Sequence, residues 1–307
     1  MKIVFMGTPD FAVPSLDAVL DAGHTVAAVF TRPDRPRGRG LQISASPVKT
    51  RACVRGLAVY QPESFKNGAQ DAFIQRLEPD CIVVTAYGRI LPKSLLDIPR
   101  YGCVNVHASL LPLYRGAAPI QWAVVRGERE SGVTTMYMAP ELDTGDIIYR
   151  EATPIGDTDT AGSLHDRLMV MGARLLVRTL TDIEAGTAPR IPQDNTLASF
   201  APTLKREDAR VDWTAPAVAV SAFIRGMSPF PGAYAGAAGE TLKVFFAMPA
   251  GRYTDGEPGS VVQTGSAGIE VLCGDGRAVL LTEVQAKGGR RMPAGDYARG
   301  HSVGKRL

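Results

Sequence analysis

An asparagine and a histidine stand two residues apart in the stretch VNVHASLLPLYRG, at positions 105 and 107. Side chains two apart in an extended strand point to the same face, so Asn105 and His107 share a face if this stretch is a strand. Asp143, in ELDTGDII, adds a carboxylate before a glycine turn. Acyl transfer needs an amide donor for an oxyanion, an imidazole as proton carrier and a carboxylate that orients it. The three residues predict acyl or formyl transfer, or hydrolysis.

Other kinds of chemistry fit these residues less well. A histidine in a strand is often only a hydrogen-bonded core residue, but the loop SLLPLYRG leaves this strand at once and favours a site. The sequence has no GxSxG and no cysteine beside His107, which favours direct transfer between substrates over an acyl-enzyme. DTG occurs once, so an aspartic-protease dyad is excluded. The four histidines lack metal-ligand spacing, and we expect no metal.

The elements that must position these residues alternate between strand-like and helical patterns. The apolar runs KIVFMG, TVAAVFT, DCIVVTAYG and GCVNVHAS are separated by segments compatible with helices. Near-continuous apolar strands between helices predict a parallel sheet that is covered on both faces. Ligands bind such sheets at the carboxyl ends of the strands, where Asn105, His107 and the loop after them fall.

The amino-acid composition of the sequence changes after a long predicted helix at residues 161–186. Residues 187–204 are rich in proline and polar side chains, which is typical of a linker. Short strands with glycine-rich turns follow, and Asp275-Gly276 is a hairpin signal between two of them. We predict a Rossmann-like α/β domain with a parallel sheet over residues 1–187, a linker over 188–205 and a small antiparallel, OB-like β-barrel over 206–307.

Charge and composition limit the class of protein. The chain of 307 residues is 45% apolar with a formal net charge of +3, so it can bury a sizeable core. Basic residues concentrate between positions 30 and 60 and again between 287 and 307, which predicts either a polyanionic partner or a solvated face. We expect no leader peptide, and the sequence contains no membrane-length apolar run and no CxxC pair. We expect a cytoplasmic protein with reduced thiols and no membrane partner.

Several stretches go further and resemble the methionyl-tRNA formyltransferase family. They are FMGTPDFAVPSL, RPRGRG followed by SPVK, AYGRILP, NVHASLLPLYRGAAPIQWA, LDTGDI and, past the linker, MSPFPGAY. The resemblance covers the catalytic half densely and reaches the start of the second domain. The family moves a formyl group from 10-formyltetrahydrofolate to the amino group of methionine on initiator tRNA. It uses a folate-binding formyltransferase domain and a barrel-like second domain.

The resemblance implies a role for each matching residue. It makes Asn105, His107 and Asp143 the catalytic set, in which Asn105 and protonated His107 stabilise the tetrahedral oxyanion and Asp143 orients the imidazole. The folate contacts that it implies are Ser109, Leu110, Leu111 and Pro112 in the catalytic loop and Tyr87, Gly88 and Ile90 in AYGRILP. Ordinary core packing is the alternative for Leu110, Leu111 and Ile90.

The same resemblance assigns the basic loop RPDRPRGRG to the acceptor end of the tRNA. Arg39, with Arg35 and Arg37, would pair with phosphates there. In the second domain Lys287, Arg290 and Arg291 are further candidates for phosphate contacts, with a solvated loop as the alternative. The family also implies a monomer.

The sequence departs from the family pattern at Leu113-Tyr114, where a basic residue and Trp are frequent, and at Phe230, where Trp is common. Both departures concern substrate packing only. A dinucleotide-dependent oxidoreductase would need GxGxxG where GTPDFA has one glycine, and a non-catalytic RNA-binding protein would leave Asn105, His107 and Asp143 idle. Closer rivals are formyltransferases for glycinamide ribonucleotide or amino-sugar nucleotides and formyltetrahydrofolate hydrolases. The arginine-rich insertion favours tRNA over a sugar nucleotide.

Overall fold

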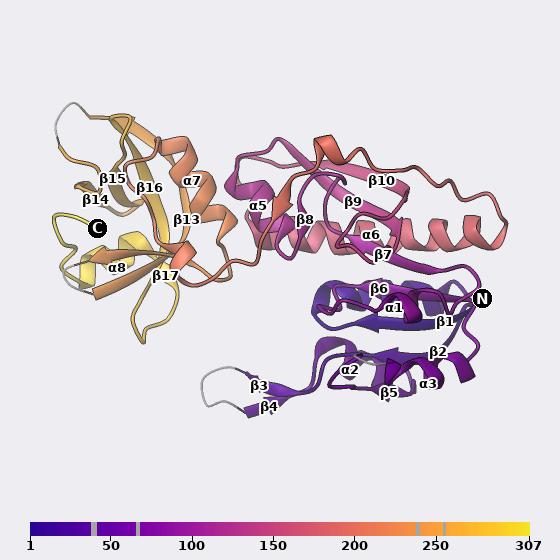
Figure 1. Ribbon diagram of the computed structural model, residues 1–307. Helices are drawn as coiled ribbons and strands as arrows, with labels where there is room; N and C mark the ends of the chain where they lie inside the picture. The colour runs from indigo at the N-terminus through magenta and orange to yellow at the C-terminus, as the bar shows by residue number, and fades with distance from the viewer. Residues whose placement is uncertain (38–41, 66–67, 238–239, 254–255) are drawn as a thin grey trace. The chain divides into compact units, whose positions relative to one another are not determined.

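The computed structural model describes residues 1–37, 42–65, 68–237, 240–253 and 256–307. The chain divides into two compact units (Figure 1). The first unit consists of Met1–Ala117, Ser131–Thr153 and His165–Ala201, and the second of Ala118–Glu130, Pro154–Leu164 and Pro202–Leu307. Both units are therefore discontinuous in sequence, because two segments that precede residue 165 belong to the second unit. The boundaries at 187 and 206 stay a prediction.

The first unit is built on a seven-stranded sheet in the order β10-β9-β7-β6-β1-β2-β5. Its strands are β1 (Lys2–Gly7), β2 (Thr25–Phe30), β5 (Val59–Tyr60), β6 (Cys81–Thr85), β7 (Cys103–His107), β9 (Glu130–Tyr137) and β10 (Ile147–Pro154). Strands β5, β2, β1, β6 and β7 are parallel to one another, as predicted. Strand β9 runs antiparallel to β7, which the sequence pattern did not predict.

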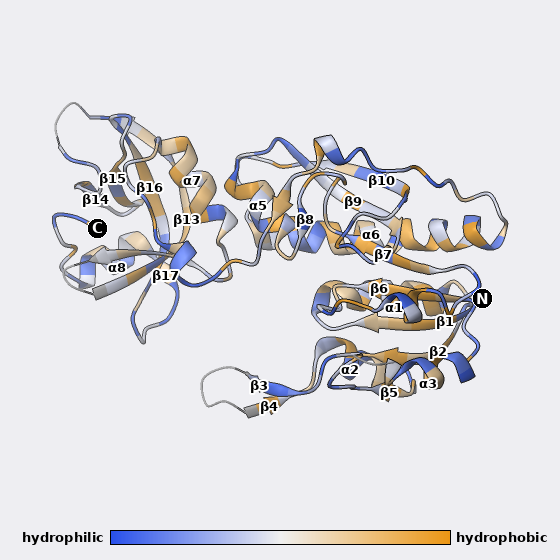
Figure 2. Ribbon diagram, viewed as in Figure 1, coloured by the Kyte–Doolittle hydropathy of each residue, from blue (hydrophilic) through white to orange (hydrophobic). Residues whose placement is uncertain are grey.

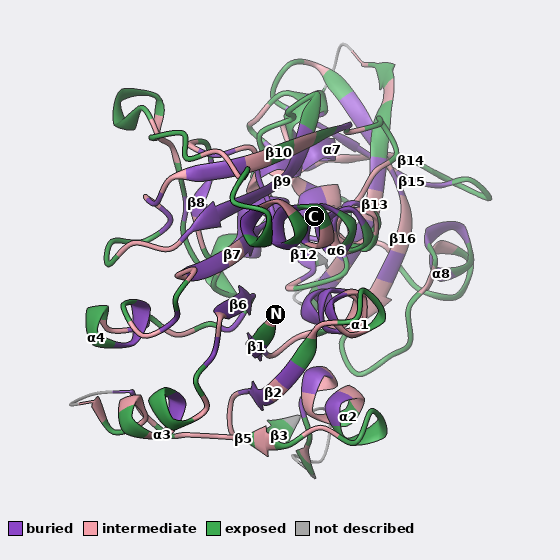
Figure 3. Cartoon of the chain, turned by 90° about the vertical axis from the view of Figure 1, so that its right-hand side faces the viewer, coloured by how far each residue is buried: buried purple, intermediate pink, exposed green. Residues whose placement is uncertain are grey.

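Helices cover both faces of this sheet. They are α1 (Val13–Asp21), α2 (Pro47–Val54), α3 (Asp71–Arg76), α4 (Lys93–Leu96) and α6 (Ala161–Glu184). Alternate residues of each strand enter two separate cores. Phe5, Val83 and Val106 pack with apolar side chains of α1, α2 and α6, whereas Met6 and Val84 pack with those of α3 and α4. Figure 3 shows β6 and β7 as almost wholly buried, which explains why their sequences are continuously apolar.

Two short strand pairs complete the first unit. Strands β3 (Arg35–Arg37) and β4 (Gln42–Ser44) form an antiparallel hairpin, and Figure 2 shows β3 as hydrophilic. Strands β8 (Arg115–Gly116) and β11 (Phe200–Ala201) pair in parallel, so residues 200–201 of the predicted linker lie against the loop that follows His107.

The second unit has an antiparallel sheet, as predicted, in the order β12-β13-β16-β15-β14 with β17 paired to β16. The predicted turn at Asp275-Gly276 joins β15 to β16, and Gly276 has a φ of +71° there. This unit has its own core around Trp213, Ile224 and Leu281. Its strands and helices are β12 (Ala233–Ala237), β13 (Glu240–Arg252), β14 (Val261–Gly265), β15 (Gly268–Leu272), β16 (Arg277–Ala286), β17 (Met292–Pro293), α5 (Pro119–Val125), α7 (Ala217–Gly226) and α8 (Ala294–Gly300).

Within the described ranges, no helix combines the length and the apolar character that a membrane span needs. The same residues contain no group of three or more His, Cys, Asp or Glu side chains placed to hold a metal ion.

The four cysteines differ in burial, and this difference predicts their reactivity. Burial raises the pKa of Cys81 and Cys273 to about 12 and raises that of Cys103 as well, whereas Cys53 is exposed. Because the thiolate is the reactive form, brief iodoacetamide treatment at pH 8 should label Cys53 alone in the folded protein. Mass spectrometry should find all four cysteines labelled after denaturation. A native adduct on Cys81, Cys103 or Cys273 would contradict this burial pattern.

Candidate active site

Strand β7 places Asn105 and His107 at the carboxyl end of the parallel strands. In the register with β9, Asn105 lies opposite Met136 and His107 opposite Thr134. Val104 and Val106, the neighbours of Asn105 on either side, belong to the core that includes Leu176 of α6. Because neighbouring residues of a strand face opposite ways, Asn105 and His107 lie on the face away from α6. The shared face that the sequence predicted is therefore confirmed.

His107 is buried, with 7% of its side chain exposed. Its Nε2 lies 3.0 Å from the carbonyl oxygen of Tyr114. A carbonyl only accepts, so Nε2 carries a proton and donates it. Nδ1 lies 3.8 Å from Oδ2 of Asp143, too far for a hydrogen bond but close enough for a strong attraction between opposite charges. Oδ2 of Asp143 is therefore the carboxylate atom that Nδ1 of His107 faces.

The backbone of the catalytic loop holds the same oxygen of Asp143 that faces His107. Its Oδ2 accepts the N–H of Gly116 at 2.8 Å. The backbone of Asp143 is left-handed, with a φ of +54°, and that of Tyr114 is too, at +61°. Non-glycine residues adopt this conformation at an energetic cost and do so most often at functional sites. A Cβ on Gly145 would lie 1.8 Å from the carbonyl oxygen of Tyr137, so the Asp143 loop requires glycine there.

The loop after His107 is fixed by hydrogen bonds to itself and to β9. Ser109 Oγ donates to the carbonyl of Leu113 at 2.6 Å. Thr134 on β9 donates its hydroxyl to the carbonyl of Ser109 at 2.6 Å and accepts the N–H of Leu111 at 3.1 Å. Thr134 is fully buried and lies opposite His107, so it ties this loop to β9, the strand next to the one that carries the site.

The seven predicted folate residues fall into two groups by exposure. The side chains of Tyr87, Ser109 and Leu111 are buried. Tyr87 packs edge-on against Phe65 with the ring centroids 5.9 Å apart, and burial raises its pKa to about 12. Ile90 is 77% exposed, Gly88 is exposed, and Leu110 and Pro112 are half-buried. Only the second group, together with backbone atoms, presents surface to a ligand.

Two of the predicted basic residues of the first unit, Arg35 and Arg37, lie on β3 of the β3–β4 hairpin. Arg35 is exposed and Arg37 ends β3, whereas Arg39 lies outside the described residues. Asp34, the acid next to them, points elsewhere, because its carboxylate accepts from Lys49 at 2.5 Å and from Gln61 at 2.7 Å. The hydrogen bond from Lys49 lowers the pKa of Asp34. Asp34 is thus engaged with its own neighbours.

The three predicted basic residues of the second unit are not equivalent. Lys287 and Arg290 are exposed in the turn between β16 and β17. Arg291 instead donates to Glu283 at 2.6 Å, and its guanidinium carbon lies 4.4 Å from the centre of the Phe245 ring. Arg291 therefore has partners within the protein, which leaves Lys287 and Arg290 as the better candidates for phosphates.

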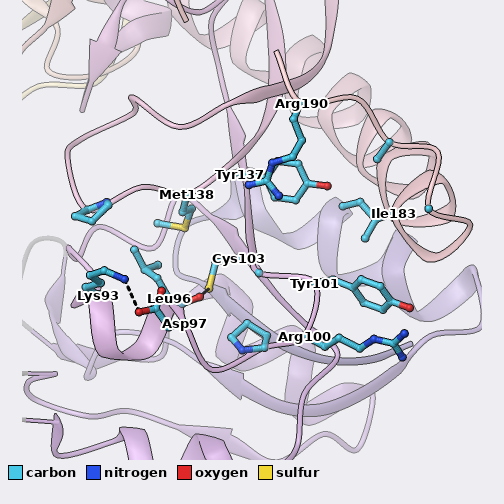
Figure 4. A pocket seen from close by; sticks show the side chains of 15 residues that line it. Lys93, Leu96, Asp97, Arg100, Tyr101, Cys103, Tyr137, Met138, Ile183 and Arg190 are labelled. Carbon is cyan, nitrogen blue, oxygen red and sulfur yellow. Dashed lines mark hydrogen bonds and ion pairs between the residues drawn. The ribbon is translucent and has the colours of Figure 1, made fainter. Parts of the chain in front are cut away.

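A cavity of about 570 Å³ lies at the other end of β7 and contains none of the predicted site residues (Figure 4). It begins beside Cys103, the first residue of β7, and Arg190 stacks over the Tyr137 ring at 3.8 Å in its wall. Lys93 and Asp97 in its lining pair with each other at 2.5 Å. The lining of this cavity contains no side-chain amide and no imidazole, and its carboxylate, Asp97, is paired with Lys93, so we place the candidate site at His107.

The segment predicted as a linker contributes contacts that sequence reasoning missed. Ser199 accepts the N–H of Tyr114 on its hydroxyl at 2.9 Å and the N–H of Arg115 on its carbonyl at 2.8 Å. A Cβ on Gly116, whose φ is +123°, would lie 2.7 Å from the carbonyl of Ala201. No local pattern in a polar, proline-rich stretch signals such pairing, because its partner lies about 85 positions earlier in the chain.

Comparison with known families agrees with this architecture. Residues 1–180 match the family model for formyl transferase, and residues 203–302 match that for the formyl transferase C-terminal domain. The chain belongs to the formyl transferase family. Among its relatives, the methionyl-tRNA formyltransferase of Moorella thermoacetica is 52% identical over 303 residues, which cover 99% of this chain and 97% of that protein. The methionyl-tRNA formyltransferase of Pelotomaculum thermopropionicum is 51% identical, covering 98% of this chain and 96% of that protein.

Solved structures of more distant proteins share the fold. An N-formyltransferase from Helicobacter canadensis, in complex with folinic acid and dTDP-3-aminofucose, has a TM-score of 0.66 at 18% identity and covers 94% of this chain and all of its own. HypX from Aquifex aeolicus in complex with tetrahydrofolic acid has a TM-score of 0.67 at 19% identity and covers 97% of this chain and 46% of its own. At these identities the likeness shows the fold alone.

Proposed function

We propose that this protein transfers the formyl group of 10-formyltetrahydrofolate to the α-amino group of methionyl initiator tRNA. The observation that carries the reaction type is the buried His107–Asp143 pair beside Asn105 at the carboxyl end of β7. The choice of substrates is supported by relatives about half identical to this chain over nearly its full length, which are methionyl-tRNA formyltransferases.

The reaction then needs no covalent enzyme intermediate. The methionyl amine forms a bond to the formyl carbon, whose carbonyl oxygen becomes an oxyanion. The Asn105 amide and the His107 imidazolium stabilise this oxyanion, and the Asp143 carboxylate stabilises the imidazolium. A proton leaves the amine and one reaches N10 as the bond between the formyl carbon and N10 breaks. The products are formylmethionyl-tRNA and tetrahydrofolate.

We assign the binding of folate and tRNA to exposed residues of the two units. Ile90 and Gly88 at the end of β6, with Leu110 and Pro112 after β7, present apolar and backbone surface for the folate. Arg35, Arg37 and Arg39 in one unit and Lys287 and Arg290 in the other would contact tRNA phosphates. We further propose that the protein acts as a cytoplasmic monomer without a metal ion.

A labelling experiment with alternative acceptors tests which acceptor receives the formyl group. Purified protein is incubated with 10-formyltetrahydrofolate that carries a labelled formyl group and is offered methionyl initiator tRNA, an amino-sugar nucleotide or water alone. We expect label on the tRNA only. Label on the sugar nucleotide alone would make the protein a sugar formyltransferase, and release of labelled formate without an acceptor would make it a hydrolase.

The unequal contacts of the basic residues predict unequal effects on tRNA binding. Arg290→Ala should weaken binding and reduce the slope of log K against log salt concentration by about 0.7–0.9, because one phosphate contact is lost. Arg291→Ala should instead lower the melting temperature, because its partners Glu283 and Phe245 lie within the protein. Filter binding over a salt series and thermal unfolding of both variants measure this. Equal salt slopes for the two variants would remove the assignment.

A further inference from the structure

Gln193 lies between the two loops that form the candidate site. Its Oε1 accepts from Nη2 of Arg115 at 2.7 Å and from Nε at 3.2 Å. Its Nε2 donates to the carbonyl oxygens of Asp143 and Gly145, both at 2.8 Å. A glutamine amide has two N–H donors and one acceptor oxygen, so every polar function of this side chain is used. One amide thus joins the catalytic loop to the Asp143 loop.

Arg115 makes this junction costly to lose. The residue is only 4% exposed, and its guanidinium bonds to the neutral amide oxygens of Gln193 and, at 2.8 Å, Asn195. Within the part of the chain that the structure describes, no carboxylate forms an ion pair with Arg115. A buried cation that loses an acceptor keeps its desolvation cost without compensation. Gln193 and Arg115 therefore hold each other in place.

The junction closes a ring that contains Asp143. Arg115 is followed by Gly116, whose N–H donates to the Asp143 carboxylate at 2.8 Å. The Asp143 carbonyl in turn accepts from Gln193. The side chain and the backbone of Asp143 are thus held by the same short network. Its left-handed backbone, at a φ of +54°, persists only if the surroundings determine it.

We propose that Gln193 is a positioning residue that sets the Asp143 carboxylate relative to His107. This inference rests on the proposed function. The hydrogen bonds of Gln193 go to Arg115 and to the backbone of Asp143 and Gly145, and not to His107, so it acts through that backbone. Misplacement of a catalytic group by about 1 Å costs on the order of 100-fold in rate, so the loss of these two donor bonds has a large effect without removing a catalytic atom.

The substitution Gln193→Glu removes the hydrogen bonds that Gln193 donates and keeps those that it accepts. A carboxylate has nearly the same shape and still accepts from Arg115, but it cannot donate to the carbonyls of Asp143 and Gly145. We expect kcat for formyl transfer to fall by about 10–100-fold, with the KM for tRNA and folate each within about twofold of wild type. Gln75→Glu, an exposed glutamine on α3, is the matched control for the added charge and should keep wild-type kcat.

A double-mutant cycle with Asp143→Asn tests the route of the effect. If Gln193 acts through Asp143, Gln193→Glu adds little to the loss already caused by Asp143→Asn. Three results would each overturn the positioning role. They are losses of kcat that multiply in the double variant, a kcat for Gln193→Glu within about twofold of wild type, and a loss confined to KM. Melting temperatures show whether all variants fold. If Gln193→Glu unfolds, Gln193→Asn replaces it in the same cycle, because asparagine keeps the amide on a shorter side chain. Failure of the wild type itself to transfer formyl groups would instead overturn the proposed function.

Discussion

Replacing His107 with alanine should lower kcat for formyl transfer by about 10³–10⁴-fold while the KM for both substrates changes little. The imidazolium is the cationic group that the proposed mechanism places against the oxyanion, and general acid–base and oxyanion contributions have magnitudes of this order. Steady-state transfer of labelled formyl to methionyl initiator tRNA measures the effect.

His107 is buried and donates to the Tyr114 carbonyl, so loss of stability must be separated from loss of chemistry. Thermal unfolding of the variant does this, and His107→Gln, whose amide can also donate to that carbonyl, is a second test. His165→Ala is the matched control, because His165 of the same unit pairs with Asp166 at 3.0 Å and lies outside the site. A folded His107→Ala protein with more than about a tenth of the wild-type kcat would exclude His107 from the chemistry.

Asp143→Asn should lower kcat by about 10²–10⁴-fold without unfolding the protein, because the charge that faces His107 is lost while the shape is kept. The new amide oxygen can still accept the N–H of Gly116, which Oδ2 accepts in the wild type at 2.8 Å. Asparagine also tolerates the left-handed backbone that this position adopts, so little strain is added. The melting temperature should therefore stay close to wild type, which single-turnover kinetics and thermal unfolding together would establish.

Asp146→Asn is the control for the loss of a carboxylate in the same loop region. Asp146 pairs with Arg190 at 3.3 Å and its side chain is 36% exposed, so its removal should leave kcat near wild type. An equal loss of kcat in both variants would mean that general electrostatics, and not the His107–Asp143 pair, carries the effect. Asp143→Ala, which adds strain and removes the acceptor for Gly116, should lose stability as well.

The sequence by itself determined the local elements and one strand of the site. Side chains of a strand have a period of two, and the near-continuous apolar runs of β1, β6 and β7 predicted parallel strands that are buried on both faces; this parallel pairing is confirmed. The same period put Asn105 and His107 on one face. The short strands and glycine-rich turns beyond residue 206 predicted the antiparallel sheet of the second unit, because turn chemistry is also local.

Only the tertiary structure decided those features of the fold and the site that depend on contacts between residues far apart in the chain. No local sequence pattern predicts the antiparallel direction of β9 or the burial of Tyr87 and Leu111. The same is true of the hydrogen bond between Ser199 and the loop after His107. The distance between His107 and Asp143 and the bridge made by Gln193 depend on backbone turns that are stable only inside the packed unit. Sequence periodicity reports which side of an element is buried, whereas the partner on that side is selected by the energy of the whole fold.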